Sequence, residues 1–242
     1  MRHLVALLAE FQSKTLALAV ATVCVMLPRL AAAQGVLPIQ WVYNPLAWVE
    51  SVGYSPDGKL LAVAGDGGVQ IFDASTGGLI RCLPTAANSS GQNSTNNAGV
   101  TSASFSSNSQ MLAVGGQSYA GSGMKLIETG VVGVWNVSNG ALIDSFDTAA
   151  NKGVYSVAFG PNGTTLAVGG QSNHNQSPNN SYGVLELWSV TSGTLTKSLI
   201  TGAAAGGCVT TVAFSADGST LAFGGERFRT MVPATKSGQV EF

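Results

Sequence analysis

Charged side chains, histidine and cysteine are all scarce in this sequence. Asp, Glu, Lys and Arg make up 10% of the 242 residues, and the chain has two histidines and three cysteines. Without the three basic residues and the one acidic residue of its first 33 positions, it keeps 8 basic and 11 acidic residues. Because a protein that tracks phosphates needs a clustered basic surface, we expect no nucleic-acid partner.

A hydrophobic run long enough to cross a membrane is also missing. The longest apolar stretch, residues 16–27, has 12 residues, whereas a membrane-spanning helix needs about 20. This length disfavours an uncleaved membrane anchor. Arg2 and Lys14 precede the stretch and Ala31-Ala32-Ala33 follows it, which is the pattern of a signal peptide. We therefore expect a signal peptide at residues 1–33, cleavage after Ala33, a secreted or periplasmic mature protein, and no stable membrane insertion after cleavage.

Glycine, by contrast, is abundant, with 31 residues, and four segments of the chain superpose as repeats. Each repeat opens with a valine, has Val or Ala three residues later, and has an aromatic residue two positions after that. The opening valines are Val49, Val100, Val154 and Val209, and the aromatic residues are Tyr54, Phe105, Phe159 and Phe214. The intervals between the valines are 51, 54 and 55 residues, so each repeat has room for one supersecondary unit.

Each repeat continues through further strand-like segments joined by turns. A tight turn follows the aromatic residue, as in Ser55-Pro56-Asp57-Gly58, where Pro presets the first corner and Gly accepts the left-handed one. A strand beginning Leu-Ala comes next, and a third strand ends in an aromatic residue, Phe72, Trp135 or Trp188. A short turn leads to a fourth strand at 79–83, 141–146 or 194–200. Four antiparallel strands per unit are typical of a propeller blade.

With its Ser-Pro-Asp-Gly turn, Leu-Ala strand and aromatic-acid pair, the first unit resembles a WD40 repeat, and the resemblance covers about residues 47–242. Two features depart from the family pattern. No Gly-His pair precedes a first strand, and Trp-Asp is changed to Phe72-Asp73, Trp135-Asn136 and Trp188-Ser189. These changes affect the hydrogen-bond network that the family builds from its His and Asp. The resemblance implies an all-β fold, a β-propeller of four-stranded antiparallel blades, with complete blades at 49–99, 100–153 and 154–208 and a truncated fourth at 209–242.

Both ends of the repeat region bear on whether the blades could close into the ring of a complete propeller. Phe242 aligns with Phe72, so the sequence stops in the third strand of the fourth unit. We expect an open fragment of a longer protein, the alternative being an edge that pairs with another chain. By resemblance, residues 34–48 are expected to form an N-terminal strand that completes the closing blade. Such a fragment is expected to self-associate through its open blade edges.

The mature chain offers few residues for catalysis or metal binding. Its only histidine, His174, lies in a polar loop without the companions that a metal site needs. Asp57 and Asp217 occupy turn positions, where an Asp side chain bonds its own backbone. We predict no catalytic residues, no metal site, no cofactor and no enzyme activity. Cys82 and Cys208 fall in the first and fourth repeats, too far apart for the ~5.5–6 Å Cα separation of a disulfide, so we predict two free thiols.

Long connections fall at one end of the predicted blades. They are the loops within blades at 117–130, 171–182 and 226–237 and those between blades at 84–99, 147–153 and 201–207. Insertions confined to one face of a repeat array often mark a binding face, although tolerated polar insertions are the alternative. Two of these loops carry the aromatic, Met and cationic side chains that are enriched at interfaces. These candidate partner-binding residues are Tyr119, Met124, Lys125, Arg227, Phe228, Arg229 and Met231.

We therefore predict an exported, non-catalytic scaffold that binds a protein or peptide. The alternative is a substrate-recognition propeller of a larger enzyme or sensor whose catalytic domain lies beyond residue 242. A propeller hydrolase with a metal on its axis is disfavoured, because the sequence lacks convergent His, Asp and Glu residues.

Overall fold

The computed structural model describes residues 49–65, 68–85, 99–120, 127–173, 181–201, 207–228 and 236–241. The chain divides into one unit of Met1–Asn44 with Ser75–Gly77 and a second of Pro45–Ala74 with Gly78–Phe242. The account below concerns the second unit. The predicted signal peptide and the predicted strand at 34–48 lie outside the described residues. In the described part of the chain, no helix has the length and hydrophobicity of a membrane span.

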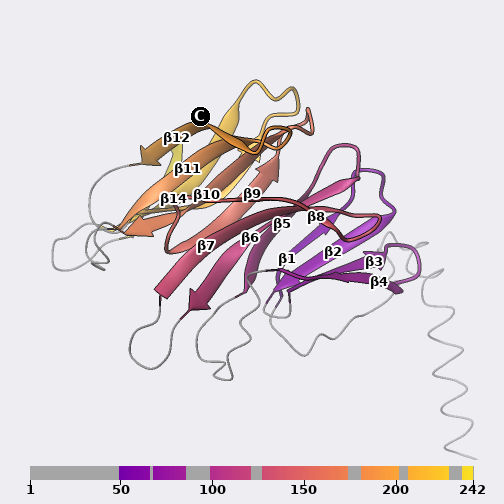
Figure 1. Cartoon of the computed structure of the whole chain (residues 1–242). Helices are drawn as coiled ribbons and strands as arrows, with labels where there is room; N and C mark the ends of the chain where they lie inside the picture. Colours follow the sequence, from indigo (N-terminus) through magenta and orange to yellow (C-terminus); the bar gives the residue numbers. More distant parts are fainter. Residues whose placement is uncertain are drawn as a thin grey trace, which may run out of the picture. The chain divides into compact units, whose positions relative to one another are not determined.

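The described residues form four antiparallel sheets, called blades 1 to 4 here, and in each sheet the strands follow one another in sequence order (Figure 1). Blade 1 consists of β1 (Val49–Tyr54), β2 (Leu60–Gly65), β3 (Gly68–Asp73) and β4 (Leu79–Leu83). Blade 2 consists of β5 (Val100–Phe105), β6 (Met111–Ala120), β7 (Ile127–Asn136) and β8 (Leu142–Phe146). Blade 3 consists of β9 (Gly153–Phe159), β10 (Thr165–Asn173), β11 (Ser181–Ser189) and β12 (Thr194–Thr201). Blade 4 consists of β13 (Cys208–Phe214), β14 (Leu221–Phe228) and β15 (Lys236–Glu241). The predicted fold class is confirmed, because three sheets have four antiparallel strands and one has three.

The hydrophobic core lies between neighbouring blades. One buried cluster joins blades 2 and 3, and it includes Val134, Phe146, Val154 and Trp188. Similar clusters join blade 1 to blade 2 and blade 3 to blade 4. A single twisted sheet cannot bury both of its apolar faces, so each blade depends on its neighbours for stability.

Serines of the first strands link each blade to the next by hydrogen bonds. Ser51 Oγ accepts a hydrogen bond from the backbone N–H of Ala103 (3.3 Å). Ser102 and Ser156 accept in the same way from Val157 and Val212, at 3.1 Å each. The three serines occupy the same position in their repeats, two residues after the opening valine. The repeated contact therefore fixes the register of one blade against the next.

In blades 1 and 4, the turn between the first two strands is held by a serine and an aspartate. Ser215 Oγ donates to Asp217 Oδ1 (2.6 Å) and accepts from the N–H of Thr220 (3.0 Å). The Ser215 bond, followed by bonds from the backbone and side chain of Ser219, lowers the pKa of Asp217 to about 2. The equivalent bond from Ser55 lowers the pKa of Asp57. Because both pKa values are lowered, this contribution to stability is present above the usual pKa of 3.8 and is lost as the pH falls below it.

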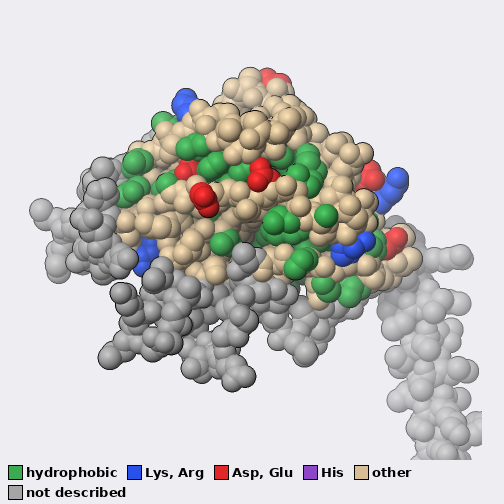
Figure 2. All heavy atoms as spheres, viewed as in Figure 1, with side chains coloured by type: hydrophobic (Ala, Val, Ile, Leu, Met, Phe, Trp, Pro, Cys, Tyr) green, Lys and Arg blue, Asp and Glu red, His purple; other side chains and the backbone are tan. Residues whose placement is uncertain are grey.

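The fourth strands are the outer edges of the blades, and each carries one charged residue among apolar ones. Arg81, Asp144 and Lys197 stand at the same place in β4, β8 and β12. Leu79, Ile80, Leu142 and Ile143 are each about half exposed beside them. Figure 2 shows hydrophobic patches with few charged side chains between them on the face in view. A charge in an edge strand opposes unwanted pairing with another sheet.

Candidate functional site

The blades have one end with short turns and one end with long hairpins. Blade 1 ends in a short hairpin, with Gly65 paired to Gly68. In blade 2, β6 and β7 stay paired as far as Ala120 and Ile127. The pairs Asn173 with Ser181 and Phe228 with Lys236 extend the hairpins of blades 3 and 4 in the same way. The loops predicted at 117–130, 171–182 and 226–237 are therefore shorter than expected. Their outer residues belong to the strands, because they continue the ladder of backbone hydrogen bonds.

Because of this correction, some of the predicted binding residues lie in strands and not in loops. Tyr119 lies in β6 opposite Glu128, and Arg227 and Phe228 lie in β14 opposite Ser237 and Lys236. Met124, Lys125, Arg229 and Met231 lie outside the described residues. Tyr119 and the pair Arg227-Phe228 belong to different blades, with blade 3 between them in the order of packing. The structure thus places three of the seven residues at the ends of strands, in two different blades.

The base of the blade 2 hairpin is tied to the connection that leads into blade 3. Lys152 Nζ forms an ion pair with Glu128 Oε2, and both side chains are about one-third exposed. The backbone N–H of Lys152 donates to the carbonyl of Gln171 in β10 (2.9 Å). Asn151 and Asn173 bond each other twice, at 2.8 and 3.3 Å. Connection 147–153 therefore holds the bases of two neighbouring hairpins in place.

A second set of hydrogen bonds connects blade 3 to the residue that precedes blade 4. Tyr155 Oη donates to Gln171 Oε1 (3.1 Å), and Gln171 Nε2 donates to the carbonyl of Gly207 (3.3 Å). Gly207 directly precedes β13. Sequence reasoning missed these residues because the partners are 16 and 36 positions apart, and nothing local in the sequence pairs them.

Glu186 in β11 is a buried acid, only 1% exposed, between blades 2 and 3. Its Oε2 accepts hydrogen bonds from Thr148 Oγ1 (2.8 Å) and Trp188 Nε1 (3.0 Å). Its Oε1 accepts from the backbone N–H of Ala149 (2.9 Å). Phe146 packs against Trp188 with ring centroids 5.1 Å apart. The carboxylate therefore anchors the connection after β8 to the third strand of blade 3.

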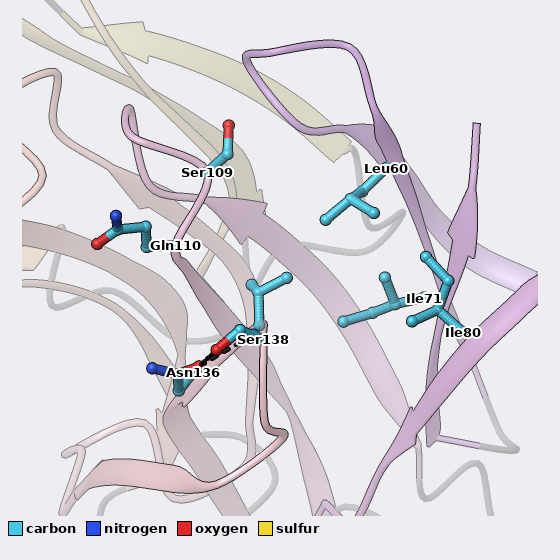
Figure 3. A pocket seen from close by; sticks show the side chains of 8 residues that line it. Leu60, Ile71, Ile80, Ser109, Gln110, Asn136 and Ser138 are labelled. Carbon is cyan, nitrogen blue, oxygen red and sulfur yellow. Dashed lines mark hydrogen bonds between the residues drawn. The ribbon is translucent and has the colours of Figure 1, made fainter. Parts of the chain in front are cut away.

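A cavity of about 480 Å³ lies at the turn end between blades 1 and 2. Figure 3 shows Leu60, Ile71 and Ile80 on one side of it and the turn residues of blade 2 on the other. Asn136 Oδ1 accepts from the N–H and hydroxyl of Ser138, at 2.9 and 2.7 Å, so Asn136 caps the turn (Figure 3). Among the described residues that line this cavity, none is acidic, basic or a histidine.

Neither Cys82, which is exposed, nor Cys208, which is partly buried, forms a disulfide within the described part of the chain. Within the described ranges, no group of three His, Cys, Asp or Glu side chains lies close enough to hold a metal ion.

Consecutive four-stranded antiparallel sheets, packed on one another through their first strands, define a segment of a β-propeller. The family model of the WD domain, G-beta repeat, matches residues 42–73 and 140–175. The first match covers β1 to β3, and the second runs from the turn before β8 to the end of β10. These two parts of the chain therefore match WD40 repeats, as the sequence predicts.

The fold comparison agrees with this assignment. The solved structure of U3-55K matches with a TM-score of 0.52 and 14% sequence identity, covering 81% of this chain and 53% of that one. At this identity the likeness concerns the fold alone. The chain spans about half the length of the structure it matches. The comparison with curated proteins found no match to the sequence.

Proposed function

We propose that this chain is an exported, non-catalytic scaffold that binds a protein or peptide through the hairpin end of its blades. WD40 propellers are generally interaction scaffolds, and this supports the class of function. The single observation that supports the choice of surface is the unequal length of the hairpins. Those of blades 2, 3 and 4 extend past their neighbouring strands, whereas the hairpin of blade 1 does not.

The bracing at the hairpin bases favours recognition by a preformed surface. The ion pair of Lys152 with Glu128 and the bonds of Asn151 and Gln171 hold the strand ends before a partner arrives. Less conformational entropy is then lost on binding. Tyr119 lies opposite Glu128 in the braced hairpin of blade 2, and Arg227 and Phe228 lie at the end of β14 in blade 4. Side chains of these types are enriched at protein interfaces.

Export is part of the proposal. Residues 1–33 serve as the signal peptide, and the repeats that follow form the mature scaffold. We expect Gln34 to be the first residue of the exported protein, because Ala31-Ala32-Ala33 directly follows the apolar stretch. N-terminal sequencing of the exported protein checks this, and a protein that keeps Met1 would contradict it.

Shortening the hairpins of blades 2 and 4 to the length of the blade 1 hairpin is expected to abolish partner binding. The change removes the proposed contact residues at 117–130 and 226–237. It also removes the Lys152–Glu128 ion pair, but pairs this exposed contribute only about 1 kcal/mol or less, so the blades stay folded. Binding of an isolated partner to the intact and shortened chains, by calorimetry, measures the effect.

The hairpin of blade 3 provides the matched control for this experiment. Residues 174–180 at its tip are nearly all small and polar, so shortening them is expected to leave the affinity unchanged. Loss of binding in this control would contradict the proposal that the partner binds at this surface. Full binding by the chain with both other hairpins shortened would contradict it as well.

A further inference from the structure

The first strand of blade 1 exposes a face that the other blades bury. Its exposed side chains are Val49 (44% exposed), Val52 (64%) and Tyr54 (65%). The valines that open the other three repeats, in contrast, are at most 1% exposed, and each packs against the preceding blade; they are Val100, Val154 and Val209. Blade 1 therefore presents a face suited to a preceding blade, and no described residue covers that face.

Blade 4 exposes the opposite half of the same kind of contact. Val212 of β13 packs over Gly169 of blade 3, and its neighbours Thr211 and Ala213 point to the other face of the strand. Both of these neighbours are exposed. Ala222, opposite Ala213, is partly exposed. The alanines at the same position in the other blades are at most 1% exposed; they are Ala62, Ala113 and Ala167.

The hydrogen bonds between blades indicate how these two faces would meet. In each of the three serine contacts described above, the hydroxyl lies two residues after an opening valine. It accepts from the backbone N–H three residues after the next opening valine. In blade 4 the hydroxyl position is occupied by Thr211, and in blade 1 the N–H position is occupied by Val52. A threonine hydroxyl can accept in the same way as a serine hydroxyl.

The sizes of the side chains at these contacts are matched in pairs. The second strand of each blade has a small residue opposite the serine or threonine; these residues are Ala64, Gly115, Gly169 and Gly224. The alanine belongs to the cluster against which Ala103 of the next blade packs. The glycines of blades 2 and 3 instead meet the larger Val157 and Val212. Because interiors are closely packed, the glycine of blade 4 fits a blade that presents a valine, and Val52 is a valine.

We propose that blade 1 of one copy of this chain docks on blade 4 of a second copy, as each blade docks on the one before it. Val52 of the first copy lies over Gly224 of the second, and its N–H donates to the hydroxyl of Thr211. Within one copy the two faces do not meet, since Val52 and Ala213 are both exposed. The contact is head-to-tail, because it joins two different faces. It does not rest on the proposed hairpin surface, because its residues lie in the first two strands of each blade.

Two blocking variants of the full chain test the direction of this contact. Val52→Arg and Ala213→Arg each place a charged side chain on one of the two faces, at exposed positions where the fold tolerates it. Light-scattering chromatography is expected to give a mass of at least two chains for the native protein and one chain for each variant alone. A one-to-one mixture of the variants is expected to form a complex of two chains, because each supplies the face that the other lacks.

The same measurement separates this arrangement from its alternatives. Leu142→Arg, on the exposed outer edge of blade 2, is the matched control and is expected to keep the native mass. If Ala213→Arg alone still associates, two blade 1 faces are in contact and the proposal is overturned. A monomeric native chain, or a mixture of the two variants that stays monomeric, would overturn it as well.

A pair of size changes tests the match between Val52 and Gly224. Gly224→Ala is expected to weaken the association about tenfold, because a methyl group is added where the valine packs. Blade 1 has an alanine at this position, so the blade itself is expected to fold. Adding Val52→Ala recreates the alanine pair of blades 1 and 2 and is expected to recover most of the loss. Sedimentation at several concentrations measures the constants, and a double variant as weak as the two single effects combined would contradict the match.

Discussion

Replacing Glu186 with alanine is expected to lower the free energy of unfolding by about 2–4 kcal/mol. The substitution leaves Trp188 Nε1 without an acceptor in a buried setting and removes the partner of Thr148 and Ala149. Thr148 and Ala149 are partly or fully exposed, so water replaces part of what they lose, and Trp188 accounts for most of the cost. Urea unfolding followed by tryptophan fluorescence measures the difference.

A double-mutant cycle distinguishes the hydrogen bond from a general loss of packing. Glu186→Ala combined with Trp188→Phe is expected to cost less than the two single changes added together, because each removes the same interaction. Gln70→Ala, at the equivalent place in blade 1, is expected to cost about 0.5 kcal/mol or less, since Gln70 is half-buried and not a central acceptor. Additive effects in the cycle, or an equal cost at Gln70, would refute the anchoring role of Glu186.

Replacing Gly115 with leucine is expected to cost more than about 3 kcal/mol and to separate blades 2 and 3. A Cβ at Gly115 would lie 2.6 Å from Val154 Cγ1 and 2.7 Å from Val157 Cγ1, and both valines are buried in the next blade. For Gly115→Ala, the gain of about 0.4–1 kcal/mol from a stiffer unfolded chain opposes an overpacking cost of about 1–3 kcal/mol. Alanine is therefore expected to be destabilising too, by a smaller amount.

Gly53 provides the control for this prediction. A Cβ at Gly53 would have nothing within 4 Å, so Gly53→Ala is expected to be neutral or to stabilise by up to about 1 kcal/mol. Denaturant melts of the three variants compare them directly. A Gly115→Leu protein as stable as the native chain would show that the blades are not packed as closely as described.

The blades could be predicted from the sequence because the signals that specify them are local. The turn Ser55-Pro56-Asp57-Gly58 contains its own hydrogen-bond partners, and Gly58 has the positive φ of 72° that the turn requires. The alternation of apolar residues within each repeat then locates the strands, although β6, β10 and β14 extend farther than predicted. The same turn is held in blade 2 although Ser109 replaces the glycine and has a φ of 62°.

The contacts between blades could not be predicted, because their partners are far apart in the sequence. Thr148 and Glu186 are 38 positions apart, and Ser102 and Val157 are 55 apart. The sequence does contain a signal for each of these two contacts. For the first it is an acid between two leucines in β11, and for the second it is a serine at the same position of three repeats. The extended hairpins were missed because residues such as Gln117 and Ser118 lack the apolar alternation of a strand, although backbone pairing alone extends β6.

The central claim is that the repeats form blades that need a neighbour on each face. Val52 and Tyr54 of β1 are 64% and 65% exposed, whereas Val157 and Val212, at the position of Val52 in later repeats, are 5% and 7% exposed. No described residue covers the outer face of β1, so a polypeptide of residues 34–242 is expected to associate through it.

Light-scattering chromatography of that polypeptide tests the claim most directly. The expected result is a mass of at least twice the monomer that falls when Val52 and Tyr54 are both changed to serine. Ile80→Ser, on the outer edge of the same blade, is expected to leave the mass unchanged. A sharp monomeric peak from the unaltered polypeptide, together with a single cooperative melting transition, would contradict the account.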